Sequence, residues 1–475
     1  MRRSKWILYS CVLLISFILG GCGNLVAPTD EENASKQEEV KLFDDFTDIE
    51  SFQGVPIMAV ANGKVEVQGD IGAGNQVAIV SGGEVNEYWA YLDVLSEYGY
   101  EKKYDNGNEG LYNKVFSAVV MKDDLSISVI HMSKSKVTYI VAEQGVDLSE
   151  SLFKKETTTK DNVIDAVTLH MVELNEYGNS FVLQLKNGHF ILCDGGRSED
   201  LEYLLTYLES LVPNGEKPVI EAWLITHPHG DHASLFTSFV DNWTYAERIY
   251  VEEMYMDTYN SDVSTRMDVT KVSLAVRTAA QKLHSTDGGH PKVYRPQAGH
   301  KYYYDDVQID VMQTMIQCPE ESWYRWTENV NEFSTWFMFN IEGQRYLNIG
   351  DADFGAMRSA MRTYDPEDFE MDIMAVSHHG INVHNEFTDY IKVNTLLYPN
   401  FGIYGSFLEG QSWGGSWQAS ENRNQYLHEK VLESYSFIDG TVVLTFPYKV
   451  GTAKSLGTTR TDRVEITDEH RIKYY

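Results

Sequence analysis

The chain has 475 residues, 43% of them hydrophobic, and its 39 basic and 70 acidic side chains give a formal net charge of −31. This length allows about two or three domains, and the apolar content excludes a disordered chain. Phosphate binding along a nucleic acid needs a basic surface, so we expect no extended nucleic-acid binding. Four cysteines are too few for a disulfide framework.

The first 40 residues predict export and attachment to a membrane. Basic residues at the start precede an apolar run over 6–19, which has the length of a signal-peptide core rather than of a spanning helix. The run ends in Leu-Gly-Gly-Cys, which resembles the lipobox of bacterial lipoproteins. We therefore expect a signal peptide over 1–21, lipid on Cys22, a flexible tether over 22–40, and an extracytoplasmic protein anchored to the bacterial cell membrane. The alternative is an ordinary signal or anchor with a chance cysteine.

Residues 41–155 predict a small α+β domain. Apolar residues at helical spacing indicate a helix over 84–98, and Gly99 is a suitable stop. Three strand-like runs with polar turns between them follow, at 115–121, 125–132 and 137–142. We find no catalytic constellation in this part, which favours a packing or binding role.

Strands and helices mix over residues 164–450, as in a layered α/β domain with sheets at the centre and helices outside. Helices are expected at 201–212 and 269–283. Strands are expected at 167–173, 180–185, 190–194, 219–226, 307–314, 335–341 and 344–349. The remaining residues, 451–475, form a C-terminal extension.

The strongest chemical signal is Thr-His-Pro-His-Gly-Asp-His at 226–232, directly after an expected strand. Imidazole and carboxylate are the usual ligands of zinc and also bind manganese and iron. A tight turn can direct His227 and His229 at one ion, while Asp231 and His232 reach a second one. Two ions that lie a few ångströms apart can hold a hydroxide between them.

Three further pieces fit the same site. Asp194 ends a strand and can orient a ligand histidine. Asp351 follows Gly350 at a strand end, where a carboxylate can bridge two cations. The pair His378-His379 also follows a strand; one of the two can complete a metal shell and the other can bind substrate or donate a proton.

These pieces, in this order, resemble the metallo-β-lactamase superfamily, and the Gly-Asp and Ser-His-His-Gly motifs look most like its competence-protein (ComEC-like) branch. The resemblance implies a four-layer αββα sandwich and two divalent ions, with zinc expected first and manganese or iron as alternatives. It implies closing strands of the second half-sandwich at 397–400 and 440–446. The ligands that it implies are His227 and His229 for one ion, Asp231, His232 and His379 for the other, Asp351 as the bridge, and Asp194 as support.

Two departures from the family pattern stand out. Many members supply a third histidine to the first metal, but the segment 311–317 offers only Gln313 and Thr314. Cys318, Glu320 or His378 could substitute, whereas His290 and His300 lie in glycine-rich loops and are expected at the surface. ComEC-like proteins with membrane channels move DNA, and this chain shows no spanning segment beyond its signal, so transport does not carry over.

The sequence thus predicts a metal-dependent extracytoplasmic hydrolase that uses a metal-bound hydroxide. Asp231 and His378 are the expected catalytic residues, and His378 or a water protonates the leaving group. The ComEC-like resemblance favours a phosphodiester substrate, either a small molecule or a cell-envelope component. The alternatives are a β-lactam, ester or thioester hydrolase of the same fold, and a non-enzymatic binding lipoprotein.

Overall fold

The computed structural model describes residues 41–43, 52–61, 63–68, 76–153, 163–257, 267–317, 330–400 and 417–462. The expected signal peptide and tether lie outside these residues. In the described part, no helix is both long and apolar enough to cross a membrane.

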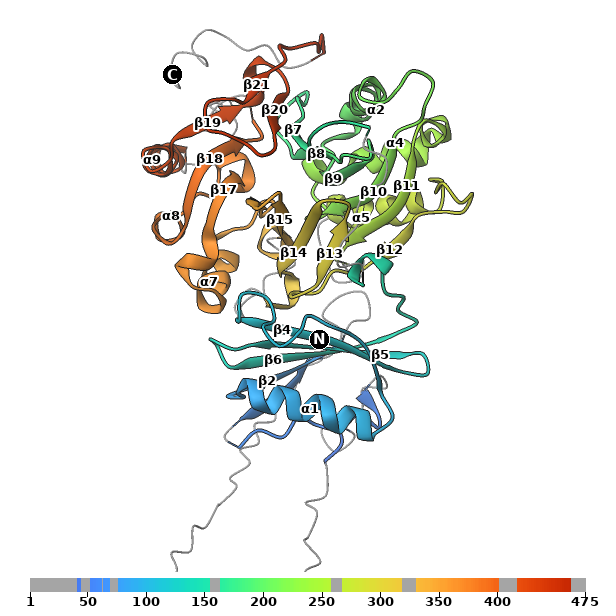
Figure 1. The fold of residues 1–475 in the computed structure, drawn as a ribbon, viewed down its shortest axis with the longest axis vertical. Helices are drawn as coiled ribbons and strands as arrows, with labels where there is room; N and C mark the ends of the chain where they lie inside the picture. The colour runs from blue at the N-terminus through green and yellow to red at the C-terminus, as the bar shows by residue number, and fades with distance from the viewer. Residues whose placement is uncertain are drawn as a thin grey trace, which may run out of the picture.

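The N-terminal domain is an antiparallel sheet of order β1-β2-β6-β5-β4-β3 with α1 (Val85–Glu97) across one face (Figure 1). The Glu84 N–H donates to Glu87 Oε2 at 2.7 Å and so caps the helix start. Gly99 follows the helix with a φ of +88°, which an L side chain rarely adopts. The helix and the three strands expected here are present. The whole sheet consists of β1 (Lys64–Gln68), β2 (Gln76–Ser81), β3 (Glu101–Asp105), β4 (Val115–Lys122), β5 (Leu125–Met132) and β6 (Val137–Gln144), of which β4, β5 and β6 are the expected strands.

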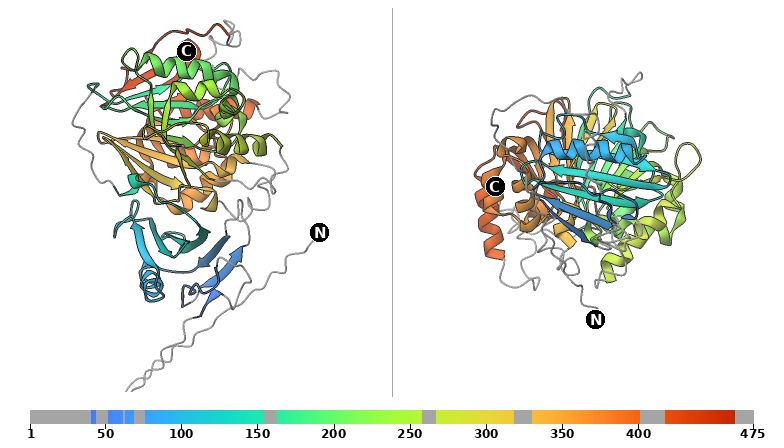
Figure 2. Two further views of the ribbon diagram at one scale, coloured as in Figure 1. Left: turned by 90° about the vertical axis from the view of Figure 1, so that its right-hand side faces the viewer. Right: turned by 90° about the horizontal axis from the view of Figure 1, so that it is seen from below.

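The second face of this sheet packs against the larger domain (Figures 1 and 2), so β4 and β5 are buried on both faces and read as nearly continuous apolar runs. Gly299 makes the approach possible, because a Cβ there would lie 2.7 Å from the Cβ of Ser117. Arg295 crosses the interface with contacts of 2.8 Å to both Glu143 and Asp257. His300 is buried here, so the expectation of a surface residue was wrong: the N-terminal domain covers the loop that carries it.

The larger domain contains two mixed sheets packed face to face. The first has the order β12-β11-β10-β9-β8-β7-β20-β21, with β9 to β12 parallel. Helices α2 (Leu201–Ser210), α4 (Leu235–Asp241) and α5 (Met267–Ala280) cover its outer face. Its strands are β7 (Thr168–Met171), β8 (Ser180–Gln184), β9 (Phe190–Asp194), β10 (Val219–Ile225), β11 (Tyr250–Met256), β12 (Lys292–Tyr294), β20 (Val442–Thr445) and β21 (Lys454–Ser455).

The second sheet has the order β13-β14-β15-β16-β17-β18-β19, with β16 to β19 parallel. Helices α7 (Phe354–Thr363), α8 (Asn385–Tyr390) and α9 (Trp417–His428) lie outside it. Its strands are β13 (Lys301–Tyr304), β14 (Val307–Gln313), β15 (Trp336–Ile341), β16 (Gln344–Asn348), β17 (Glu370–Ala375), β18 (Lys392–Tyr398) and β19 (Glu433–Ser436). The layers are helix, sheet, sheet and helix, as expected.

One strand assignment was wrong. The strand expected at 440–446 is β20, and it pairs with β7 in the first sheet rather than closing the second half of the sandwich. The chain returns from β19 to the opposite sheet, and Phe437, Val442 and Leu444 fill the core between the sheets. An alternating apolar pattern indicates a strand but does not indicate which of two facing sheets it joins.

Candidate metal centre

The histidine-rich turn follows β10 and runs directly into the short helix α3 (Gly230–Ala233). His227 and His232 are fully buried, and His229 is partly exposed. A Cβ at Gly178 would lie 2.7 Å from the Asp231 carbonyl oxygen, so the preceding loop packs closely on this turn. The turn therefore presents its imidazoles at the carboxyl end of a parallel strand, where ligands bind in open α/β sheets.

Asp351 follows β16 in the opposite sheet, directly after a glycine. Gly350 has a φ of +53°, and a Cβ there would lie 2.7 Å from the Thr226 hydroxyl oxygen. The Asp351 N–H donates to Ser334 Oγ at 3.1 Å. The glycine and this hydrogen bond place the carboxylate against the histidine-rich turn.

The pair His378-His379 follows β17, the next strand of that sheet. Both residues have left-handed backbones, with φ of +50° and +55°. That conformation is uncommon for residues other than glycine and costs about 1–3 kcal/mol where it is held. Hydrogen bonds hold it: Asn400 donates to the His379 carbonyl at 3.2 Å, and Asn424 donates to the Gly380 carbonyl at 2.5 Å.

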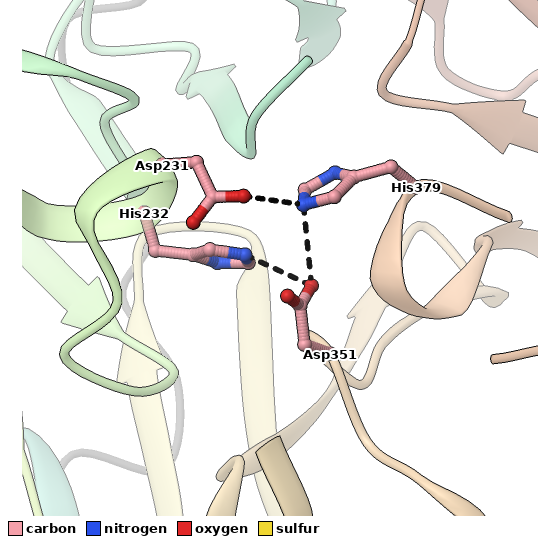
Figure 3. Close-up of side chains that lie close together, drawn as sticks. All are labelled: Asp231, His232, Asp351 and His379. Carbon is pink, nitrogen blue, oxygen red and sulfur yellow. Dashed lines mark hydrogen bonds and ion pairs between the residues drawn. The ribbon is translucent and has the colours of Figure 1, made fainter. Parts of the chain in front are cut away.

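The structure brings the predicted ligands together in two groups that share Asp351, and within each group the ligand atoms lie within 4.8 Å of one another. The first group is His227, His229 and Asp351. The second, shown in Figure 3, is Asp231, His232, Asp351 and His379.

The two oxygens of Asp351 face different groups. Oδ1 lies 2.9 Å from His232 Nε2 and 3.4 Å from His379 Nε2. Oδ2 lies 3.7 Å from His227 Nε2 and 3.5 Å from His378 Nε2. One carboxylate thus reaches both groups, as a bridging ligand must, and His378 lies beside the first group.

The residues fit divalent cations. Both oxygens of Asp351 are buried and face imidazole nitrogens, and Oδ1 lies 2.9 Å from Nε2 of the buried His232. Such groups are costly to bury unless they are paired or coordinate a metal. Imidazole and carboxylate donors suit zinc, manganese and iron.

Asp194 supports the second group. Its Oδ2 lies 2.7 Å from His232 Nδ1, and its Oδ1 accepts the Thr226 N–H at 2.8 Å. The Thr226 hydroxyl and the Asn179 amide also donate to Oδ2, at 2.7 and 2.6 Å. An Nδ1–H that donates to Asp194 leaves the Nε2 lone pair of His232 directed toward Asp351 and the metal position.

The buried groups shift one another's pKa. Burial lowers the pKa of His227 well below its ordinary value. Burial also lowers the pKa of His232, but the charges of Asp351 and Asp194 outweigh it and raise that pKa well above its ordinary value. Burial raises the pKa of Asp351, yet the charges of His232, His378 and His379 hold it well below its ordinary value. The carboxylates are therefore ionised and attract cations.

A third histidine for the first group is absent from the described residues near 311–317. The Gln313 amide donates to the Ala356 carbonyl at 3.2 Å, and Thr314 bonds with Gln317. Cys318 and Glu320 lie outside the described residues. Of the three suggested substitutes, His378 is the one that the structure places beside this group.

Several supporting residues escaped prediction as site residues, namely Tyr177, Asn179, Arg197, Thr226, Asn400 and Asn424. Their roles depend on contacts between segments far apart in the chain, for which the sequence carries no local signal.

The family model described as the metallo-beta-lactamase superfamily matches residues 175–304. This segment of the chain is therefore similar to the metallo-β-lactamase superfamily, and the layered sheets with helices outside confirm the expected fold class. The matched segment holds Asp194 and the turn at 226–232, while Asp351 and the pair His378-His379 follow it.

Several solved structures are similar at low identity. The metallo-beta-lactamase fold protein YhfI from Bacillus subtilis is 11% identical, over 59% of this chain and 99% of YhfI, with a TM-score of 0.35. Zn(2+)-bound PqqB from Methylobacterium extorquens is 12% identical, over 55% of this chain and 86% of PqqB, with a TM-score of 0.32. A Cronobacter sakazakii metallo-beta-lactamase with a HARLDQ motif is 12% identical, over 54% and 88%, with a TM-score of 0.27. No curated protein matches the chain.

Proposed function

We propose that the protein is a metal-dependent hydrolase that acts outside the cytoplasm on a phosphodiester. The observation that carries the proposal is Asp351, a buried carboxylate whose two oxygens face imidazoles of two separate groups of candidate ligands. Two divalent ions held there would activate water and neutralise the charge that develops during hydrolysis.

The chain's own residues divide the remaining work. His227 and His229 would hold one ion, and Asp231, His232 and His379 would hold the other. The His379 imidazole lies 3.1 Å from Asp231 Oδ2, so each fixes the orientation of the other.

His378 is free for proton transfer. It is 21% exposed at the mouth of the centre, and its Nδ1 lies 3.4 Å from the Asn331 amide nitrogen. An imidazole in this position can hold a proton at Nε2 and deliver it to the leaving oxygen.

The substrate class and the location rest on the sequence. The motifs around Asp351 and His378 resemble the ComEC-like branch, which favours a phosphodiester of a small molecule or of the cell envelope. The apolar run before Cys22 supports a lipid-anchored position outside the cell membrane. With a net charge of −31, the metal ions supply the local positive charge that a phosphate group needs.

The test is hydrolysis of bis(4-nitrophenyl) phosphate by the purified chain with zinc or manganese. We expect metal-dependent turnover that falls about 100-fold or more in Asp231→Asn, because that change removes a ligand charge. Asp93→Asn makes the same change on the exposed side of α1 and serves as the matched control. Turnover of a β-lactam or a carboxylic ester instead would overturn the phosphodiester assignment, and a protein that binds no metal would overturn the hydrolase.

A further inference from the structure

An arginine and a tyrosine lie beside the metal centre and have no part in holding the ions. Tyr177 lies in the loop between β7 and β8, and Arg197 directly precedes the short 3-10 helix Ser198–Asp200 that leads into α2. The Tyr177 ring centre is 5.4 Å from that of His379. The guanidinium carbon of Arg197 is 4.8 Å from the Tyr177 ring centre. The ring of Tyr177 therefore lies between the Arg197 guanidinium and His379, a predicted metal ligand.

This pair lies on the solvent side of the centre. The deepest predicted ligands are at most 1% exposed. Asp231 is 13% exposed, His378 21% and Arg197 24%. Arg197 is thus more exposed to solvent than the predicted ligands beside it.

Arg197 has looser contacts with carboxylates than two other arginines of the described part, Arg295 and Arg460. Arg295 and Arg460 each contact two carboxylates at 2.6 to 3.0 Å. The one carboxylate within 4 Å of Arg197 among the described residues is Glu176, at 3.7 Å; the charge of Asp231 also acts on the guanidinium, and its buried Nε makes no hydrogen bond. An unpaired donor at a buried nitrogen is a position for an acceptor that arrives with a ligand.

A buried ion pair fixes the backbone of these loops. Asp200 accepts the N–H groups of Asn175 and Arg197, both at 2.8 Å. The same carboxylate pairs with Arg460 at 2.6 Å, and the two side chains are at most 1% exposed. Arg460 comes from the C-terminal extension, so the end of the chain holds the mouth of the centre in place.

We propose that Arg197, stacked on Tyr177, binds an anionic group of the substrate at the mouth of the metal centre and so selects esters that carry a negative charge. The proposal rests on the proposed function and narrows its substrate class. A guanidinium binds phosphate or carboxylate oxygens through charge-assisted hydrogen bonds, and the aromatic ring fixes its plane. In a chain of net charge −31, a local cation also offsets the repulsion that an anionic substrate meets.

The experiment compares the zinc-loaded wild type with Arg197→Gln, Arg197→Lys and Lys217→Gln. Lys217 is the matched control, because it stacks on Tyr250 at 4.9 Å and precedes β10 at the end away from the metal turn. Two readouts are used: binding of inorganic phosphate by calorimetry, and kinetics with bis(4-nitrophenyl) phosphate and with the neutral 4-nitrophenyl acetate.

We expect Arg197→Gln to weaken phosphate binding and raise KM for the diester, each about 10-fold, with kcat for the diester and kinetics of the acetate little changed. Arg197→Lys should recover part of the loss, and Lys217→Gln should match the wild type. Unchanged phosphate binding in Arg197→Gln, absent binding in the wild type, or equal losses with both esters would overturn the proposal. If the wild type turns over no diester, the proposed function fails, while the calorimetry still decides the role of Arg197.

Discussion

Buried histidines in this protein form two sets with equal burial and opposite surroundings. In the metal centre, His227 and His232 face the carboxylate oxygens of Asp351, at 3.7 and 2.9 Å. Away from it, His131 bonds with Thr138 at 2.9 Å, and His300 bonds with the Tyr302 hydroxyl at 3.0 Å. Burial alone therefore does not identify a functional histidine; the groups that its nitrogens face do.

One histidine of the metal centre also differs in pKa from the buried histidines away from the centre. Burial lowers the pKa of His131 and of His170 to about 4, and that of His300 to about 3, so all three are neutral near pH 7. His232 is shifted in the opposite direction by its carboxylate neighbours, despite the same burial. The histidines away from the centre fill a core, whereas those of the metal centre face carboxylates whose negative charge a cation can balance.

The largest expected effect comes from removing the shared carboxylate. Asp351→Ala should abolish both metal sites, because each group loses the ligand that it shares with the other. We expect metal content to fall from about two ions per chain to nearly none, and turnover to fall about 1,000-fold or more. Elemental analysis after dialysis measures the first, and the diester assay measures the second.

His131→Gln is the control for that variant, since it changes a buried histidine of the other set. It should retain full metal content and turnover. If it lost metal as Asp351→Ala does, the distinction between the two sets would be wrong.

A smaller effect is expected at the supporting aspartate. Asp194→Asn keeps the size of the side chain but removes the negative charge beside His232 Nδ1. Loss of a group that hydrogen-bonds to a metal ligand lowers metal affinity about 10- to 100-fold. Competition with a zinc chelator should show weaker binding at one site and little change at the other. Equal weakening at both sites would contradict the assignment of Asp194 to the second group.

The smallest expected effect is on the free energy of unfolding and concerns the buried histidines away from the metal centre. A lowered pKa means that the unfolded chain binds more protons than the folded chain between about pH 6.5 and 4. The contribution of such a histidine to the free energy of unfolding is thus complete above its pKa in the unfolded chain and is lost as the pH falls toward its pKa in the folded chain. His131→Gln, which stays neutral, should remove about 2 kcal/mol of the loss between pH 7 and pH 5. Urea unfolding of the wild type and the variant at both pH values measures the difference; parallel losses would mean that His131 has no such role.

The sequence by itself determined the elements and the chemistry of the ligands. The apolar spacing at 84–98 and 201–212 was enough for two helices, because one helical face must be buried. The turn at 226–232 was enough to predict a metal site, because three imidazoles and a carboxylate follow one strand. The positions of Asp351 and His379 could be inferred as well, since each follows an apolar strand directly.

Only the tertiary structure decided which distant segments meet. It paired β20 with β7, because strand patterning does not encode the choice of sheet. It buried His300 under the N-terminal domain. It also placed Arg197 and Tyr177 beside His379, and the ion pair between Asp200 and the distant Arg460 holds the loop that carries Arg197. These contacts join residues that are remote in sequence, and a remote contact depends on how the packed layers align rather than on any local pattern of residues.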